Sequence, residues 1–260
     1  MAHPPKIGGH VRAPLPRFTV FSPGHRLTMY GFFHRWGELA MRVLVPGGHL
    51  VIASTPMFLP TVSSAILDAG FELRGIIVRL VQTLRGGFRP KNAEEEFSDL
   101  CTMPRAHWEP WILFRKPVEK GLTVAENLRK WEAGALRRDP DGTPFPDVIL
   151  SERTLEREKA IAPHPTLKPQ SFMRRIFWAI VPLEEGEILD PFCGAGSTLA
   201  AELQKTFLIF LSHDSFLIDA VIVLLESGAR PRQTKSSSSN SPIHIALNLA
   251  IPSYLFHIQR

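Results

Sequence analysis

From residue 30 onward, hydrophobic positions switch repeatedly between helical and strand-like spacing. Apolar residues recur every three or four positions between Tyr30 and Leu44, which predicts a helix that packs on one face. The Pro-Gly-Gly sequence at 46–48 ends this helix, and the apolar, β-branched run His49–Ser54 predicts a buried strand. A helix over Thr61–Ala69 and one or two strands over Phe71–Leu84 follow. Alternation of this kind predicts an α/β sheet.

The same alternation returns in the second half of the chain. The apolar run Ile112–Phe114 predicts a strand, and Gln170–Val181 predicts an amphipathic helix. A short strand over Glu187–Asp190 leads through a glycine turn into a helix over Gly194–Gln204, and Phe207–Leu211 predicts one more strand. The sheet is therefore expected to draw strands from both halves of the chain.

Composition divides the chain into four parts. Residues 1–84 and 151–227 carry most of the regular pattern. Residues 85–150 mix glycines, prolines, acids and aromatics, which predicts a loop-rich insertion. The serine-rich, basic segment inside 228–260 predicts a disordered or atypical tail without a regular element.

Charge and cysteine content narrow the class of protein. A net charge of +5 and a pI near 9.5 fit a polyanionic partner, and they equally fit an ordinary basic enzyme. The two cysteines are too few for a disulfide framework and have no metal-ligand spacing, so we expect no metal and a reducing compartment. The start of the chain has no signal-peptide core, and the apolar stretch Phe207–Leu225 is interrupted by His213 and two aspartates. We therefore expect a cytoplasmic protein with no membrane contact.

The strongest chemical signal lies at residues 189–198, Leu-Asp-Pro-Phe-Cys-Gly-Ala-Gly-Ser-Thr. A strand that ends in a Gly-x-Gly turn before a helix lets a ligand approach the backbone closely. Taken alone, this pattern fits any nucleotide-like cofactor, and it also fits a plain structural turn. The spacing does not match the longer glycine fingerprint of dinucleotide folds or the phosphate-binding loop.

A second motif lies upstream, His-Pro-Thr-Leu-Lys-Pro at 164–169. With these two motifs in this order, and with Arg-Val-Leu-Val-Pro-Gly-Gly-His-Leu-Val-Ile at 42–52, the chain resembles the DNA methyltransferases that methylate exocyclic amino groups, over roughly residues 4–201. The resemblance implies a Rossmann-like sheet with helices on both faces and S-adenosylmethionine as cofactor. The order of the motifs is similar to the circularly permuted beta class of that family.

The resemblance also implies roles for segments and residues. Residues 1–84 would form the catalytic part, 85–150 the target-recognition insertion and 151–227 the cofactor-binding part. The expected cofactor-binding residues are His164, Thr166, Lys168, Asp190, Phe192, Gly194, Gly196 and Ser197. Asp214 is expected to reach the ribose, because Ser212 stands where the family usually has an acid.

The catalytic motif departs from the family pattern of a polar residue, Pro-Pro and an aromatic residue. The candidate here is His3-Pro4-Pro5-Lys6, in which His3 can accept a hydrogen bond from the target amino group. Lys6 cannot stack on a base, although Phe18 or Phe21 can take that role. An extended N-terminal segment without catalytic function is the alternative.

Cations and aromatic residues in the insertion are the candidate nucleic-acid contacts. We expect phosphate contacts from Arg85, Arg89, Lys91 and Arg105, next to His107 and Trp108. The alternative is a solvated loop whose arginines pair with the acids at 94–96. Trp36, Trp111, Trp131 and Trp178 are expected in the core.

Together these features predict a site-specific DNA methyltransferase of the restriction–modification or orphan type, which transfers a methyl group from S-adenosylmethionine to adenine N6 or cytosine N4. Two alternatives remain: a catalytically impaired relative that only binds nucleic acid, and a methyltransferase that acts on RNA or protein.

Overall fold

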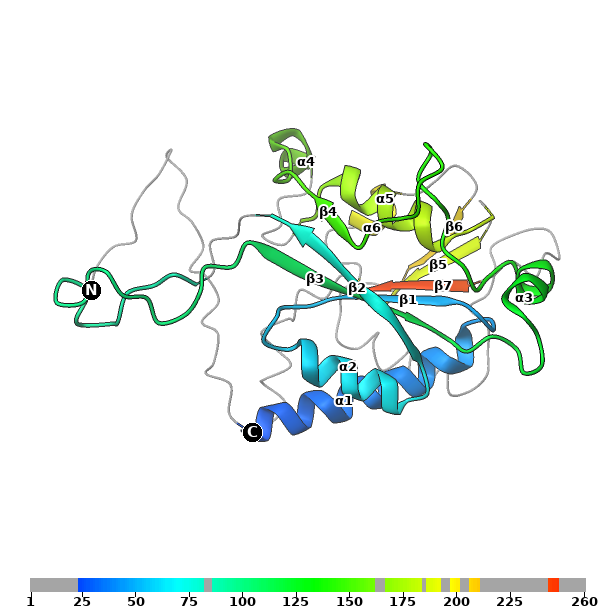
Figure 1. The fold of residues 1–260 in the computed structure, drawn as a ribbon, viewed down its shortest axis with the longest axis horizontal. Helices are drawn as coiled ribbons and strands as arrows, with labels where there is room; N and C mark the ends of the chain where they lie inside the picture. Colours follow the sequence, from blue (N-terminus) through cyan, green and yellow to red (C-terminus); the bar gives the residue numbers. More distant parts are fainter. Residues whose placement is uncertain are drawn as a thin grey trace.

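The sheet draws strands from most of the chain. The computed structural model describes residues 23–81, 86–161, 167–183, 186–192, 197–201, 206–210 and 243–247. These residues form a seven-stranded sheet in the order β4-β2-β3-β1-β7-β5-β6 (Figure 1). The strands are β1 (His49–Ala53), β2 (Glu72–Leu80), β3 (Trp108–Arg115), β4 (Val148–Leu150), β5 (Gly186–Asp190), β6 (Thr206–Phe210) and β7 (Ile243–Leu247). β3 runs antiparallel to both of its neighbours, and every other pairing is parallel.

Helices cover both faces of this sheet. The described helices are α1 (Pro23–Val43), α2 (Leu59–Asp68), α3 (Val124–Trp131), α4 (Glu156–Ile161), α5 (Gln170–Ile180) and α6 (Ser197–Ala200). α1 and α2 lie below the sheet in Figure 1, while α5 and α6 lie above it. The mixed α/β class with helices on both faces, expected from the sequence, is confirmed.

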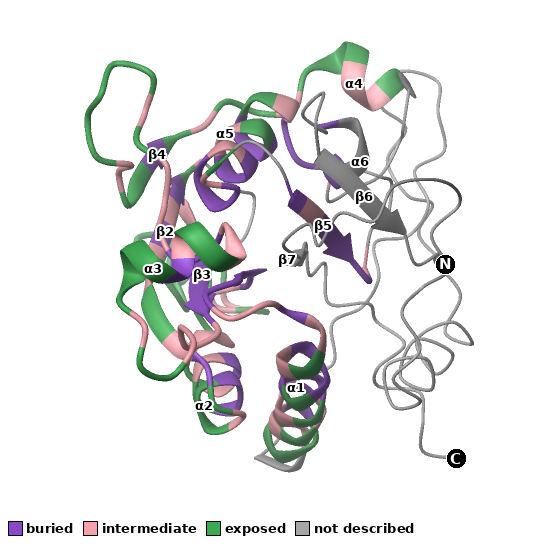
Figure 2. Ribbon diagram, turned by 90° about the vertical axis from the view of Figure 1, so that its right-hand side faces the viewer, coloured by how far each residue is buried: buried purple, intermediate pink, exposed green. Residues whose placement is uncertain are grey.

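Alternation along β1 and β3 builds one core on each face. Leu50 and Ile52 point into a cluster with α1 and α2, whereas Val51 and Ala53 point into a cluster with α5. All five residues of β1 are buried, as expected of a strand covered on both faces. Strand β5, drawn mostly in purple in Figure 2, is largely buried as well. The sheet therefore packs against a hydrophobic cluster on each of its faces.

The turn before β1 needs a glycine. Gly47 has a φ of +80°, and a Cβ atom there would lie 2.5 Å from Nδ2 of Asn127. Asn127 is fully buried, donates to the carbonyls of Pro46 and Ala133, and accepts from the N–H of Glu119. Its helix, α3, begins at a capping box between Thr123 and Glu126. One asparagine thus joins the start of β1 to the segment that follows β3.

Two expectations about the chain's organisation need correction. Residues 85–150 are not an insertion throughout, because β3 lies in the interior of the sheet and β4 at its edge. Two connections within this range leave the sheet: residues 116–147, which contain α3, and the stretch between β2 and β3, whose described residues 86–107 extend to the left in Figure 1. Within 228–260, where no regular element was expected, β7 pairs in parallel with β1 and β5. Five residues of alternating pattern are too short to stand out in a sequence, and only pairing with neighbouring strands fixes them.

Candidate functional site

Charged residues lie at the edge of the sheet where the parallel strands end. β1, β2 and β5 run in the same direction, and β3, which is antiparallel, begins at the edge where they finish. This edge therefore holds Arg79 near the end of β2, Glu109 at the start of β3 and Asp190 at the end of β5. In open α/β sheets, ligands bind outside the carboxyl ends of the strands.

Asp190 is the most perturbed acid at this edge. Its side chain is fully buried, and one carboxylate oxygen, Oδ1, accepts the N–H of Phe192 at 3.0 Å. Burial raises the pKa of Asp190 to about 6, against smaller lowering effects of the Thr198 hydroxyl and the Phe192 N–H. Oδ2 of Asp190 and Oγ1 of Thr198 are both buried, and neither makes a hydrogen bond of normal geometry with the described residues. A buried carboxylate oxygen at the end of β5, beside a buried hydroxyl of α6, is suited to a polar ligand.

The two sequence motifs meet at Ser197, the first residue of α6. Its hydroxyl accepts the backbone N–H of Lys168 at 3.3 Å, and its carbonyl accepts Nε2 of Gln170 at 3.0 Å. Phe192 turns toward α1 instead, with its ring 6.4 Å from that of Phe32 and 6.5 Å from that of Trp36. Lys168, Asp190 and Ser197, all expected at the cofactor site, therefore belong to one region of the fold.

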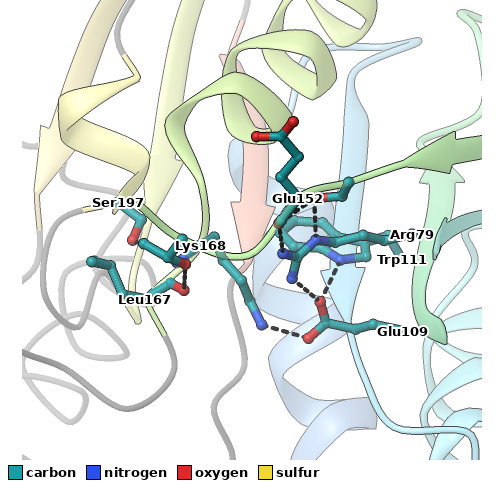
Figure 3. Close-up of polar contacts among 9 residues, drawn as sticks. Arg79, Glu109, Trp111, Glu152, Leu167, Lys168 and Ser197 are labelled. Atoms are coloured by element: carbon teal, nitrogen blue, oxygen red, sulfur yellow. Dashed lines mark hydrogen bonds and ion pairs between the residues drawn. The ribbon is translucent and has the colours of Figure 1, made fainter. Parts of the chain in front are cut away.

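An ion-pair triad lies beside this region (Figure 3). Glu109 binds Nζ of Lys168 at 2.5 Å through Oε1 and the Arg79 guanidinium at 3.0 Å through Oε2. Burial alone would raise the pKa of Glu109, but the two cations outweigh it and hold that pKa below its ordinary value. Trp111 donates its indole N–H to the same carboxylate at 3.3 Å.

Arg79 extends the triad to the segment that follows β4. It donates to the Ser151 hydroxyl at 2.9 Å and to the Glu152 carbonyl at 3.3 Å, and its guanidinium lies 5.2 Å from the centre of the Phe172 ring. The Thr154 hydroxyl in turn donates to the carbonyl of Leu167. The sequence alone does not predict a role for Arg79 or Glu109. The only signal was an acid within the aromatic stretch that opens β3, and no motif marks its two partners.

The loop over 86–107 carries the candidate nucleic-acid contacts. Arg89, Lys91 and Arg105 are exposed, and none of them forms an ion pair with any described residue, including the acids at 94–96. Cations lie in its two arms, at 86–91 and 102–107, whereas its four acids lie between them at 92–101. The arms are joined by hydrogen bonds from the N–H groups of Gly87 and Thr102 to the carbonyls of Met103 and Phe88. Arg89 and Arg105 therefore do not pair with the neighbouring acids, as the alternative interpretation would require.

This loop also depends on a glycine. Gly86 has a φ of +77°, and a Cβ atom there would overlap the carbonyl oxygen of Pro104. The two arms thus come into direct backbone contact near the sheet, which gives the loop a narrow base.

Several predicted site residues lie outside the described part of the chain. They are His3, Pro4, Pro5, Lys6, Arg85, His164, Thr166, Gly194, Gly196 and Asp214. Among the described residues, no three side chains of His, Cys, Asp or Glu converge as a metal site would require. None of the described helices combines the length and apolar character needed to cross a bilayer.

Comparison with known proteins identifies the family. The sequence profile of the DNA methylase family, which comprises N6 and N4 methyltransferases, matches residues 25–210. The chain belongs to this family. It is 34% identical over 195 residues to the type II methyltransferase M.HindIII of Haemophilus influenzae, covering 66% of this chain and 62% of that protein. It is 26% identical over 190 residues to the type II methyltransferase M2.LlaDCHI of Lactococcus lactis subsp. cremoris, covering 72% and 64%.

The chain therefore spans a little under two thirds of the length of these curated relatives. Among solved structures, it is similar to the cytosine-N4-specific PvuII DNA methyltransferase, with a TM-score of 0.49, 13% identity and 83% of each chain covered.

Proposed function

We propose that this protein is a DNA methyltransferase that transfers a methyl group from S-adenosylmethionine to an exocyclic amino group, adenine N6 or cytosine N4. The observation that carries the proposal is the meeting of Asp190, Ser197 and Lys168 at the carboxyl edge of the sheet, in a chain of the DNA methylase family. The cation-bearing loop leaves the sheet at the same edge. A cofactor site and a nucleic-acid loop would thus face the same region.

The residues at this edge fit the methionine part of the cofactor. S-adenosylmethionine carries an α-ammonium group, and the unsatisfied Oδ2 of Asp190 is an acceptor for such a cation. A bound ammonium would favour the ionised carboxylate and so offset the burial that raises its pKa. We assign the remaining contacts to His164, Thr166, Gly194 and Gly196 and to the backbone of Phe192, since its ring packs against α1. We assign the ribose contact to Asp214.

The bound cofactor would supply an electrophilic methyl group. The target nitrogen must present its lone pair, and we assign this task to the segment His3-Pro4-Pro5-Lys6. A neutral His3 would accept a hydrogen bond from the amino group and localise the nitrogen lone pair for attack. DNA as substrate implies a protein of the cytoplasm, at the nucleoid.

Calorimetric titration with S-adenosylmethionine, followed by transfer of its labelled methyl group to DNA of mixed sequence, tests the proposal. We expect micromolar binding and label on duplex DNA. Gly196→Asp is expected to abolish binding, because its side chain would fill the space needed by the methionine moiety. Binding without transfer to any DNA would favour the impaired relative. Transfer to RNA or protein but not to DNA would show that DNA is not the substrate. Unchanged affinity of Gly196→Asp for S-adenosylmethionine would refute the assignment of Gly196 to the cofactor pocket.

The loop cations make a separate prediction about salt. If Arg89 and Arg105 contact phosphates, the double variant Arg89→Gln/Arg105→Gln should bind duplex DNA more weakly. Its plot of log affinity against log salt concentration should be shallower by about one unit for each phosphate that the variant no longer neutralises. Fluorescence anisotropy at several salt concentrations measures this slope. The matched control is Lys120→Gln/Arg129→Gln, which removes two exposed cations at and near α3, on the far side of the sheet in Figure 1. Equal slopes for the two double variants would contradict a role of the loop.

A further inference from the structure

We propose that Glu109 is a positioning residue for cofactor binding, acting through Lys168. The inference rests on the proposed function, and it assigns to that site a residue of β3 that belongs to neither sequence motif. Glu109 is the one described carboxylate that binds both Lys168 and Arg79. It therefore connects the segment that carries Lys168 to the sheet itself.

Two members of the triad belong to the ladder between β2 and β3. Arg79 and Glu109 are paired residues in the ladder between β2 and β3, next to the end of that ladder. Arg79 is 7% exposed and Glu109 is 20% exposed, and Trp111, which donates to the same carboxylate, is fully buried. Arg79 and Trp111 hold the Glu109 carboxylate in place. The Glu109 carboxylate in turn fixes the position of the Lys168 ammonium.

The position of Lys168 matters because its backbone contacts the glycine-turn helix. The same residue donates its N–H to Ser197 and its ammonium to Glu109, and the neighbouring Leu167 carbonyl accepts the Thr154 hydroxyl. Lys168 therefore contacts β3 through its ammonium and α6 through its backbone N–H. Loss of the Glu109 charge would leave the 11%-exposed Lys168 side chain without its carboxylate and draw it toward solvent. The backbone at 167–168 would then shift against Ser197.

The structure offers a matched control in the same ladder. Glu72 and Arg115 also pair between β2 and β3, with Oε2 of Glu72 2.6 Å from the guanidinium, but at the opposite edge of the sheet. Glu109→Gln and Glu72→Gln each remove one charge from one ion-paired strand carboxylate. Only Glu109 contacts the cofactor segment.

Calorimetric titration with S-adenosylmethionine separates the two variants. We expect Glu109→Gln to bind the cofactor about tenfold more weakly, and Glu72→Gln to bind within twofold of the wild type. Thermal melting of both variants reports any shared loss of stability. Equal affinities of Glu109→Gln and the wild type would overturn the proposal, and so would equal losses in both variants.

A double-mutant cycle distinguishes positioning from a general structural effect. In a Lys168→Met background, Glu109→Gln should change the cofactor affinity less than twofold, because the residue through which it acts is gone. Fold-losses that multiply would show that Glu109 acts independently of Lys168 and would overturn the proposal. If Glu109→Gln does not fold, Glu109→Asp takes its place in the cycle, since its shorter side chain cannot reach both cations. A wild type that binds no cofactor would instead refute the proposed function.

Discussion

At pH 8, the Asp190→Asn protein without cofactor is expected to be more stable than the wild type, by on the order of 3 kcal/mol in the free energy of unfolding. Burial raises the pKa of Asp190 from 3.8 to about 6, so an ionised carboxylate is held at pH 8 in a place that disfavours it. Asparagine keeps the acceptor for the Phe192 N–H and carries no charge. Urea unfolding of the two proteins at pH 8 measures the difference.

The pH dependence of the same pair has a definite sign. Between about pH 4 and pH 6, the folded wild type retains a proton on Asp190 that the unfolded chain releases. Stability from this group is therefore present at low pH and is lost as the pH rises through that window. Asp190→Asn should lack this loss.

A second buried group acts in the opposite direction. Burial lowers the pKa of His49 from 6.5 to about 4, helped by Arg115 and Arg74, while a hydrogen bond from Nδ1 to the Ile180 carbonyl opposes the shift. The folded protein therefore binds fewer protons at His49 than the unfolded chain between about pH 4 and pH 6.5, and this contribution rises with pH.

The contributions of the two groups have opposite signs, so each is measured as the difference between a variant and the wild type. The stability of Asp190→Asn relative to the wild type should rise with pH between about 4 and 6, and that of His49→Asn relative to the wild type should fall between about 4 and 6.5. Parallel profiles for the wild type and Asp190→Asn would show that Asp190 does not titrate in this window. Asp190→Asn should also bind S-adenosylmethionine more weakly, because the buried charge that lowers the stability of the protein is the same charge that would bind the ammonium group of the cofactor.

The sequence predicts best those parts of the fold in which local pattern and burial agree. Helix α1, strand β1 and helix α5 follow from apolar spacing, because each packs one apolar stripe or one complete apolar run on the sheet. Strand β3 was expected only at Ile112–Phe114 but begins at Trp108. Its first residues include Glu109 and Pro110, which lower the strand signal, and pairing with β2 outweighs that local preference.

The candidate site also contains both residues that the sequence predicts and residues that it does not. Lys168, Asp190 and Ser197 were predicted from motifs because the turn chemistry requires particular residues in order. Glu109 and Arg79 were not, because each is ordinary in its local sequence and acquires a role only when β2, β3 and the 167–168 segment meet. Such contacts depend on strand order, and strand order does not follow from local pattern.

Among the four tryptophans expected in the core, the structure buries Trp36 and Trp111 and leaves Trp131 and Trp178 half-buried. Trp111→Ala is expected to lower the free energy of unfolding by about 3–5 kcal/mol. The Trp111 ring is fully buried, and its centre lies 4.9 Å from that of Phe172 in an edge-to-face arrangement. Alanine would leave a large cavity below the triad and remove one donor from Glu109.

Trp178→Ala is the matched control for this variant. Its half-buried ring lies 4.2 Å from the Arg137 guanidinium, and its indole N–H donates to the carbonyl of Arg138. An exposed interaction of this kind contributes about 1 kcal/mol, so the control should lose much less stability in urea unfolding followed by circular dichroism. Because Trp111 also supports Glu109, only Trp111→Ala should weaken binding of S-adenosylmethionine at a temperature where both variants are folded. Equal stability losses in the two variants would mean that the face of the sheet under α5 is not packed around Trp111.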